Sequence, residues 1–413
     1  MLATTIALTG GPCAGKTTAQ TWIEHELEHR GISCLFVTEA ATEIFEMGSA
    51  TRKTDSTNRQ AAIMSLQCAK EDAAKRIAES APEPVVVICD RGLADAFAYV
   101  TPEQMAVILG ELGIEREEVN DRYDAVIYLT SAAIDAPEAY TTENNPQRTE
   151  TVQEAALADR RTLEEWVGHP HLRVVSSRNG SFEEKMRRTV AEVVSAIGVG
   201  DPLECERKWL VNATPKWAEG QACHSVSRIT QTYLTNAGPG SESRVRCRER
   251  DGHWEYVRTT KTNTDDPARR IERERRISAR EYADALKSAD PNLVPIEKTR
   301  HAFVLNDTFM ELDFYQDGKA LPHGKAILEI ECANPDAIVL PPELADGAVE
   351  VTGQKEFSNH AIARRLAEHS THVHSKDEAH DAVAWYTHLF ETTFGERDLI
   401  NCAVKPLSSD LGI

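Results

Sequence analysis

GGPCAGKT, residues 10–17, is the most informative stretch of this 413-residue sequence. It follows a short apolar segment at residues 5–8 and precedes a helical pattern over residues 17–30. Gly10 and Gly15 let backbone N–H groups curl around an anion, and the N-terminus of the following helix adds a favourable dipole. The spacing GxxxxGK[ST] between a strand and a helix therefore predicts a phosphate-binding loop (P-loop). In such a loop Lys16 reaches the β- and γ-phosphates and the Thr17 hydroxyl ligates Mg²⁺.

The nucleoside triphosphate is expected to contact this loop and one arginine further along the chain. The residues assigned to it are Gly10, Gly11, Pro12, Cys13, Ala14, Gly15, Lys16, Thr17, Thr18 and Arg91.

Strand-like and helix-like segments alternate on both sides of the P-loop. Apolar strands are predicted at residues 5–8, 33–38, 84–89, 125–129 and 172–175, with helices at 17–30, 59–79 and 182–197. This alternation predicts an α/β domain with a parallel sheet and helices on both faces. The glycine- and proline-containing segment 198–202 ends the pattern, so the domain is predicted to span residues 1–198.

Two carboxylates follow predicted strands of this domain. Asp90 ends the run PVVVIC, where an acid can orient Mg²⁺ and its water, and Glu39 ends the second strand. Because ligands bind at the carboxyl ends of parallel strands, both acids are predicted to face the phosphates. Each could instead be a helix N-cap or a solvated turn residue. A third candidate is Arg148, in an Asn/Arg-rich segment before a helix that bears Arg160, where a lid arginine could stabilise transferred charge.

This part of the sequence resembles the small P-loop kinase-like family, which is similar to nicotinamide-riboside kinase and the deoxynucleoside kinases. The segments that carry the resemblance are the GGPCAGKTT loop, the EAAT segment, the DRG turn and the Asn/Arg-rich segment. The resemblance covers roughly residues 1–195. It implies that Glu39 is the base for an acceptor hydroxyl and that Asp90 and Arg91 handle metal and phosphates. It does not identify the acceptor.

After Pro202 the sequence changes to strands with period-two alternation. Strands are predicted at residues 203–211, 227–234, 243–250, 254–261, 269–278, 295–305, 308–315 and 326–331, with helices at 279–288 and 358–368. This pattern predicts an antiparallel barrel or strongly curved sheet over residues 203–370, followed by an acidic helical tail at 371–413.

Charged residues recur on one face of these predicted strands, because residues two apart share a face. Carboxylates suit Mg²⁺ or Mn²⁺, and arginines and lysines suit phosphate oxygens, so this face could hold a phosphate chain with its metals. An ordinary solvated sheet is the alternative.

The motifs ExExK at residues 204–208, RxExE at residues 270–274 and the paired charges between and after them resemble the CYTH, or triphosphate tunnel metalloenzyme, family. The resemblance covers roughly residues 203–370 and implies an eight-stranded antiparallel tunnel that hydrolyses organic triphosphates or inorganic polyphosphate with a divalent metal. The implied phosphate-binding residues are Lys208, Arg244, Arg246, Lys261, Arg270, Lys298 and Arg300, with Lys208 also catalytic. The metal ligands assigned to the chain are Thr17 and Asp90 in the P-loop domain and Glu204, Glu206, Glu272, Glu274, Asp313, Glu329 and Glu331 in the tunnel.

Composition limits the setting and the partners. Of the residues 41% are hydrophobic and 27% charged, and the net charge of −20 disfavours nucleic acid as a partner. The nine cysteines are scattered without a CxxC pair, which is typical of reduced thiols in the cytoplasm. Neither a signal peptide nor an apolar run of the ~20 residues needed to span a membrane is visible, so no integral membrane association is expected.

Two functions remain open. The first is a bifunctional enzyme: an ATP- or GTP-binding kinase or NTPase fused to a metal-dependent triphosphatase. The second is a nucleotide-controlled protein whose tunnel binds a phosphorylated ligand without turnover. This alternative is kept because the domain pair resembles the TRPL-translocation-defect type proteins, which are associated with GTP and phosphoinositide binding. The choice between ATP and GTP and the oligomeric state stay open.

Overall fold

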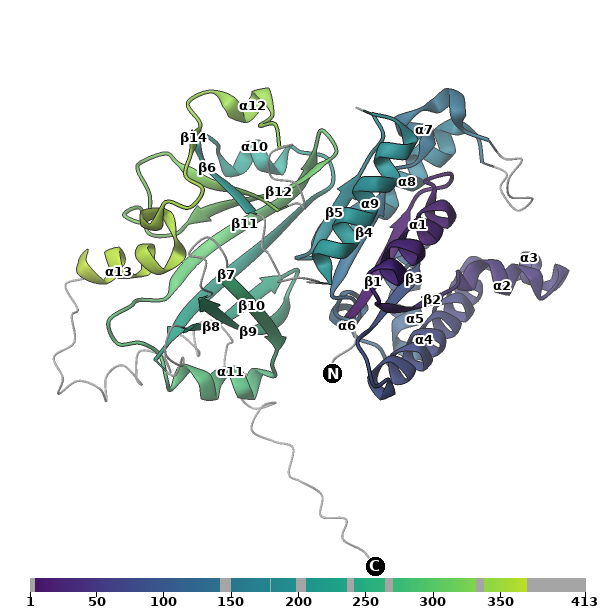
Figure 1. Cartoon of the computed structure of the whole chain (residues 1–413), viewed down its shortest axis with the longest axis horizontal. Coiled ribbons are helices and arrows are strands. Elements are labelled where there is room, and N and C mark those ends of the chain that lie inside the picture. Colours follow the sequence, from purple (N-terminus) through teal and green to yellow (C-terminus); the bar gives the residue numbers. More distant parts are fainter. Residues whose placement is uncertain are drawn as a thin grey trace, which may run out of the picture. The chain divides into compact units, whose positions relative to one another are not determined.

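The computed structural model describes residues 4–141, 150–178, 180–197, 206–235, 241–263, 270–331 and 338–369 (Figure 1). They form a five-stranded sheet of order β2-β3-β1-β4-β5 and a nine-stranded sheet of order β10-β9-β8-β7-β11-β12-β13-β6-β14. The first sheet is parallel, and the pairs β6–β14, β7–β8, β8–β9 and β9–β10 of the second are antiparallel. The predicted order, an α/β P-loop domain followed by an antiparallel β domain, is confirmed.

The strands of the parallel sheet are short and apolar. They are β1 (Thr4–Gly10), β2 (Ser33–Val37), β3 (Val85–Asp90), β4 (Ala125–Leu129) and β5 (Leu172–Val175). Successive residues of the central strands enter different cores: Ile6 and Leu8 of β1 pack on one face, and Ala7 packs on the other. Burial on both faces explains why these strands read as continuous apolar runs and not as alternating ones.

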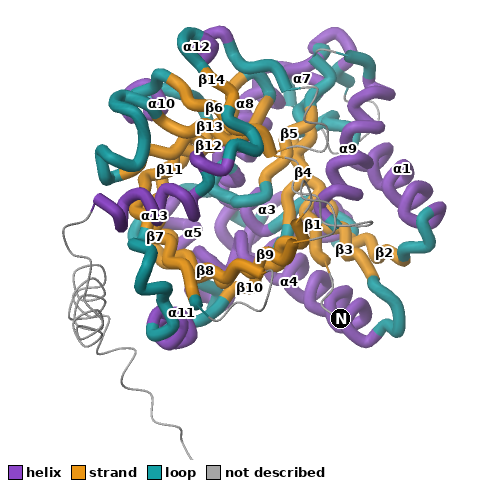
Figure 2. The backbone as a smooth tube through the Cα atoms, turned by 60° about the vertical axis from the view of Figure 1, so that its left-hand side comes forward, coloured by secondary structure: helices purple, strands orange, loops and turns teal. Residues whose placement is uncertain are grey.

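Helices cover both faces of this sheet (Figures 1 and 2). One face packs against α1 (Lys16–His29) and α9 (Phe182–Ala196). The other packs against α4 (Ser56–Ser80), the 3-10 helix η1 (Leu93–Tyr99), α5 (Pro102–Leu112) and α8 (Val152–Trp166). Shorter elements connect them: α2 (Ala40–Glu46), α3 (Ser49–Lys53), α6 (Arg116–Asp121), α7 (Ala132–Asp135) and η2 (Pro137–Ala139).

All eight strands predicted for the β domain are present, with ends within three residues of those expected. They are β6 (Glu206–Val211), β7 (His224–Leu234), β8 (Ser241–Arg250), β9 (His253–Asn263), β10 (Arg270–Arg276), β11 (Ile296–Leu305), β12 (Thr308–Tyr315) and β13 (Ala326–Glu331). The ninth strand, β14 (Val349–Glu350), was not predicted because it has only two residues. Helices in this part are α10 (Pro215–Glu219), α11 (Ala279–Leu286), α12 (Pro342–Ala345), η4 (Lys355–Phe357) and α13 (Asn359–His369).

The register of β8, β9 and β10 gathers charged residues on one face. Arg244 lies opposite Thr259, which lies opposite Glu274, and Lys261 lies opposite Glu272. Directly paired residues point to the same face of a sheet, so the predicted charged face exists across these three strands.

The opposite face of these strands is mixed: it carries an apolar cluster, and by register also Arg258, which lies opposite Val245. Val245 and Cys247 of β8 pack there against Tyr282 and Leu286 of α11, with Ile277 just after β10. Part of this face therefore packs on a core, as is common in antiparallel sheets.

A closed barrel would require pairing between the terminal strands β10 and β14. No such pairing is found in the part of the chain that the structure describes. Closure into a tunnel therefore stays a prediction.

By spatial contacts the chain divides into two compact units. One contains Met1–Val226 with His301–Leu312 and Ile327–Thr352, and the other Ser227–Arg300 with Asp313–Ala326 and Gly353–Ile413. The nine-stranded sheet therefore contributes strands to both units. The predicted boundary at residues 198–203 and the tail at 371–413 lie outside the described residues and stay predictions. Within the described ranges no helix has the length and apolar character needed to cross a membrane.

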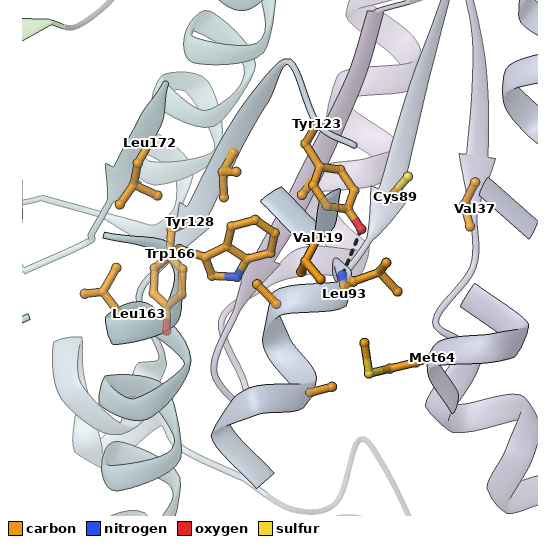
Figure 3. Packing of buried hydrophobic residues seen from close by; sticks show 14 of the residues in the cluster. Val37, Met64, Cys89, Leu93, Val119, Tyr123, Tyr128, Leu163, Trp166 and Leu172 are labelled. Atoms are coloured by element: carbon orange, nitrogen blue, oxygen red, sulfur yellow. Dashed lines mark hydrogen bonds between the residues drawn. The ribbon is translucent and has the colours of Figure 1, made fainter. Parts of the chain in front are cut away.

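Tyr123 shows how the core of the P-loop domain holds its polar atoms (Figure 3). Its phenol oxygen accepts from the Leu93 backbone N–H at 2.8 Å and donates to Glu71 Oε1 at 2.7 Å. All three groups are buried, so the phenol satisfies an amide and a carboxylate that water does not reach. The start of η1 is fixed by this contact.

We predict that Tyr123→Phe lowers the free energy of unfolding by about 1–3 kcal/mol, because it leaves a buried amide and carboxylate without this partner. Urea denaturation measures the change. Ile77→Ala, at an α4 position that is 57% exposed, is the control and should shift the value by less than about 0.5 kcal/mol. Equal effects of the two substitutions would contradict the prediction.

Candidate functional site

The P-loop adopts a backbone that needs its glycines. Gly10 has φ 141° and Gly15 has φ 91°, both in the region that side chains disfavour. A Cβ on Gly10 would lie 2.0 Å from the Leu129 carbonyl oxygen, and one on Gly15 would lie 2.8 Å from the Phe182 ring. The loop is therefore packed from both sides, and α1 begins directly after it at Lys16.

A cavity of about 1380 Å³ opens above the P-loop. Ten of the residues predicted for this domain line it: Pro12, Cys13, Ala14, Gly15, Lys16, Thr17, Thr18, Glu39, Asp90 and Arg91. The structure thus brings together residues from the ends of β1, β2 and β3, as expected for the carboxyl edge of a parallel sheet.

Lys16 is folded onto its own loop. Its Nζ donates to the carbonyl oxygens of Gly10 at 3.2 Å and Gly11 at 3.4 Å. Burial and the neighbouring Arg91 guanidinium lower the pKa of Lys16. An anion in the cavity would counter both effects, so this side chain is suited to meet phosphate.

Asp90 has the features of a metal ligand. Its Oδ1 is buried and has no hydrogen-bond partner among the described residues. Burial raises the pKa of this carboxyl, and the nearby Lys16 ammonium opposes the rise. Mg²⁺ prefers oxygen ligands, and this buried carboxylate oxygen beside the P-loop has no hydrogen-bond donor among the described residues. Asp90 and the Thr17 hydroxyl therefore fit a Mg²⁺–nucleotide complex.

Glu39 and Arg91 form an ion pair through Glu39 Oε1 and Arg91 Nε. Glu39 stands at the N-cap position of α2, but its carboxylate accepts from Thr42 Oγ1 at 2.8 Å and from Arg91, not from a capping backbone amide. Burial works against the charge of Glu39, yet Arg91 and Lys16 lower its pKa to about 2. Glu39 therefore occupies the N-cap position that was the alternative interpretation, but its side chain does not cap the helix.

Asp95 was missed by the sequence analysis although it completes this cluster. It is 4% exposed and lies on η1, where it accepts from Arg91 Nη1 at 3.2 Å. Thr9 Oγ1 and Trp166 Nε1 also donate to it, at 2.7 and 2.6 Å. Its spacing of four residues after Arg91 was the available signal. Arg91 itself has φ 69°, which aims its side chain back toward the P-loop carbonyl of Gly10.

Elements other than the P-loop also line the cavity. Phe45 of α2, Ile63 and Met64 of α4, and Tyr99 of η1 are apolar lining residues, and Arg52, Ser56, Arg59 and Gln60 are polar ones. The lining therefore includes groups from α2, α3, α4 and η1 as well as the P-loop.

The predicted lid arginine, Arg148, lies outside the described residues. Arg160 and Arg161 lie on the exposed side of α8.

In the β domain, Lys298 and Arg300 of β11 meet Asp313 of β12. Arg300 Nε and Nη2 donate to the two Asp313 oxygens at 2.7 Å each, and Lys298 Nζ pairs with Oδ2. Asp313 is fully buried, and Lys298 and Arg300 are 3% and 8% exposed. The carboxylate predicted to hold metal is thus bound to two cations.

The charged face of β8–β10 is paired in a similar way. Arg246 Nη2 and Thr259 Oγ1 both donate to Glu274 Oε1, at 2.7 and 2.8 Å. Arg244 and Lys261 are on the same face by register. Arg270 and Glu272 lie on β10, but their side chains are outside the described part of the chain.

On β6 and β13 the predicted residues also meet one another. Lys208 Nζ lies 2.7 Å from Glu329 Oε1 and 3.1 Å from Glu206 Oε1. Glu331, two residues further along β13, has a side chain that is 35% exposed. Glu204 is outside the described residues. No group of three or more His, Cys, Asp or Glu placed to hold a metal is found among the residues described.

Comparison with known proteins identifies the first domain. Residues 5–185 match the family model described as an AAA domain, so this part of the chain is an AAA-type P-loop nucleotide-binding domain. No curated protein matches the sequence. Among solved structures, the PH1819 protein from Pyrococcus horikoshii OT3 aligns with 33% of this chain and 80% of its own, at 19% identity and a TM-score of 0.24. A TM-score this low carries no functional conclusion.

We predict that Lys16→Ala abolishes measurable binding of Mg²⁺–ATP and Mg²⁺–GTP, because the phosphates lose their only lysine from the P-loop motif. Isothermal titration calorimetry measures the affinity. Lys75→Ala, an exposed lysine of α4, is the control and should bind as the wild type does. Undiminished affinity in Lys16→Ala would contradict the assignment of this site.

Proposed function

We propose that the P-loop domain transfers the γ-phosphoryl group of ATP or GTP to a hydroxyl of a small acceptor. The observation that carries this proposal is the extent of the cavity. At about 1380 Å³ it exceeds the roughly 300–1,000 Å³ of common single-ligand pockets. Its lining also includes Phe45, Ile63 and Tyr99, which lie on elements other than the P-loop. A cavity of this size can take a nucleotide on the P-loop together with a small second substrate.

In the proposed step the acceptor oxygen attacks the γ-phosphorus while its proton passes to the Glu39 carboxylate. The bond between the γ-phosphorus and the β–γ bridging oxygen breaks, and the nucleoside diphosphate leaves with that oxygen. Lys16 and the P-loop amides hold the phosphates in place for in-line transfer. Mg²⁺, held by Thr17 and Asp90, would supply charge neutralisation on the phosphates.

The pairing of Glu39 with Arg91 sets the order of events. A carboxylate with a pKa of about 2 is a weak base near neutral pH. The phosphates of a bound nucleotide offer Arg91 a stronger anionic partner than Glu39. Once Arg91 turns to them, the largest influence that lowers the pKa of Glu39 is removed. Glu39 then becomes a better proton acceptor only when nucleotide is present.

We predict that Glu39→Gln lowers kcat at least about a hundredfold, as loss of a general base does, with little change in nucleotide affinity. Transfer of labelled γ-phosphate from ATP and GTP to a panel of hydroxyl-bearing small molecules is the assay. Glu43→Gln is the matched control, because Glu43 lies on the same helix, pairs with Lys70 and is 43% exposed. Normal turnover by Glu39→Gln with an accepted substrate would exclude this mechanism.

For the β domain we propose binding of a triphosphate or polyphosphate, followed by metal-dependent hydrolysis as the CYTH resemblance implies. The charged face of β8–β10 and the buried cations Lys298 and Arg300 support phosphate binding, since lysine and arginine bind phosphate oxygens.

One observation favours the alternative of a phosphate-ligand sensor without turnover, for a ligand such as a phosphoinositide. The described carboxylates Glu206, Glu329 and Asp313 are each bound to lysine or arginine. Hydrolysis would require some of them to exchange these partners for a metal.

We predict that the full chain carrying Lys16→Ala hydrolyses tripolyphosphate with Mg²⁺ or Mn²⁺, and that EDTA stops the reaction. Adding Glu329→Gln should slow phosphate release by orders of magnitude, because a metal-binding carboxylate is lost. Glu350→Gln is the control: Glu350 pairs with Arg207 at the exposed strand β14. Tripolyphosphate binding without metal-stimulated release would exclude hydrolysis and support the sensor.

A further inference from the structure

Asp159 lies on α8 and is 1% exposed. It is not among the residues that line the nucleotide cavity. An acidic residue this deeply buried is costly unless it is well hydrogen-bonded, so its contacts indicate what it is for.

The carboxylate joins two loops. Asp159 Oδ1 accepts from the backbone N–H of Gly11, in the P-loop, and from that of Ser131, after β4, at 2.9 Å each. The Asp159 carbonyl oxygen accepts from the Tyr128 hydroxyl at 2.6 Å, which fixes this turn of α8 against the sheet.

The same junction holds the next two residues of the P-loop. The Ser131 hydroxyl donates to the Pro12 carbonyl oxygen, and the Ala132 N–H donates to the Cys13 carbonyl oxygen at 3.3 Å. These bonds are made within the protein, so they set the path of residues 11–13 independently of a ligand.

The fit at Gly11 leaves no room for a side chain. A Cβ there would lie 2.4 Å from Asp159 Oδ1 and 2.7 Å from Asp159 Cβ. Unlike Gly10 and Gly15, Gly11 does not have a positive φ. The reason for glycine at this position is therefore the approach of Asp159 and not the backbone conformation.

Keeping a charge here is unfavourable for the carboxyl itself. Burial raises the pKa of Asp159 to about 6, and the two backbone amides only partly offset the rise. A group retained in an unfavourable environment indicates a role beyond packing.

We propose that Asp159 is a positioning residue for nucleotide binding: by holding the Gly11 and Ser131 amides it sets the P-loop path that presents Lys16 and the following amides to the phosphates. The proposal rests on nucleotide binding by this domain. It adds α8, which carries Asp159, to the elements that determine affinity.

The test is calorimetric titration of the full chain with Mg²⁺–ATP and with Mg²⁺–GTP. Asp159→Ala removes the acceptor and should raise Kd by between about tenfold and a hundredfold, the range that misplacement of binding groups produces. Asp159→Asn retains an oxygen acceptor of the same shape and should stay within about threefold of the wild type. The control Thr162→Val alters a buried α8 residue whose hydroxyl donates to the Ala158 carbonyl oxygen of the same helix, and it should leave Kd unchanged.

Each outcome decides the proposal. Wild-type affinity in Asp159→Ala, or a loss in folded Asp159→Asn as large as that in Asp159→Ala, would overturn it. If Asp159→Ala does not fold, Gly11→Ala tests the same contact from the loop side, and unchanged affinity there would overturn the proposal equally. Absence of nucleotide binding by the wild type would instead refute the function of the domain, which keeps the two failures distinct.

Discussion

Parallel pairing of β1 with its two neighbours is the constraint on which the site depends. Leu8 lies opposite Asp90 on β3, and Gly10 lies opposite Leu129 on β4. This register ends three strands at one edge, so the P-loop, Asp90 and Arg91 meet although they are separated by about 80 residues in the chain. Moving β3 by one residue would turn Asp90 to the other face of the sheet.

Most of the charged groups at this edge are paired within the protein. Two cations, Lys16 and Arg91, face the carboxylates of Glu39, Asp90 and Asp95. Carbonyl oxygens of the P-loop accept from both cations. A nucleotide must therefore replace some contacts within the protein by contacts with its phosphates. Its affinity is the difference in free energy between these two sets of contacts, not the sum of the contacts it makes. The same exchange would release Glu39 for proton transfer.

Much of the fold was predictable because its signals are local. Buried parallel strands appear as apolar runs, and the strands of the β domain show alternation, so even the ends of β4, β5, β12 and β13 were predicted correctly. The short helices α2 and α3 and the 3-10 helix η1 were not predicted, since few periodic residues define them.

Asp95 and Asp159 were missed for a different reason. Apart from Arg91, four residues before Asp95, their partners Trp166, Thr9 and Gly11 come from distant parts of the chain, and no local pattern shows such contacts. In the β domain, alternation predicted the charged face but not which cation each carboxylate binds.

Helix α8 touches the site at two glycines. Asp159 approaches Gly11, and Trp166 lies 2.7 Å from where a Cβ of Gly92 would be. The two α8 residues are seven positions apart, which is about two helical turns and a rise of about 10.5 Å, so they share one face of the helix. The length of α8 between these two residues therefore sets the separation at which the helix contacts the loop after β1 and the turn after β3. Inserting or deleting one residue between Asp159 and Trp166 would rotate one of them by about 100° away from its glycine. We therefore expect related sequences to keep a separation of seven positions between the residues equivalent to Asp159 and Trp166, even where the residues between them differ.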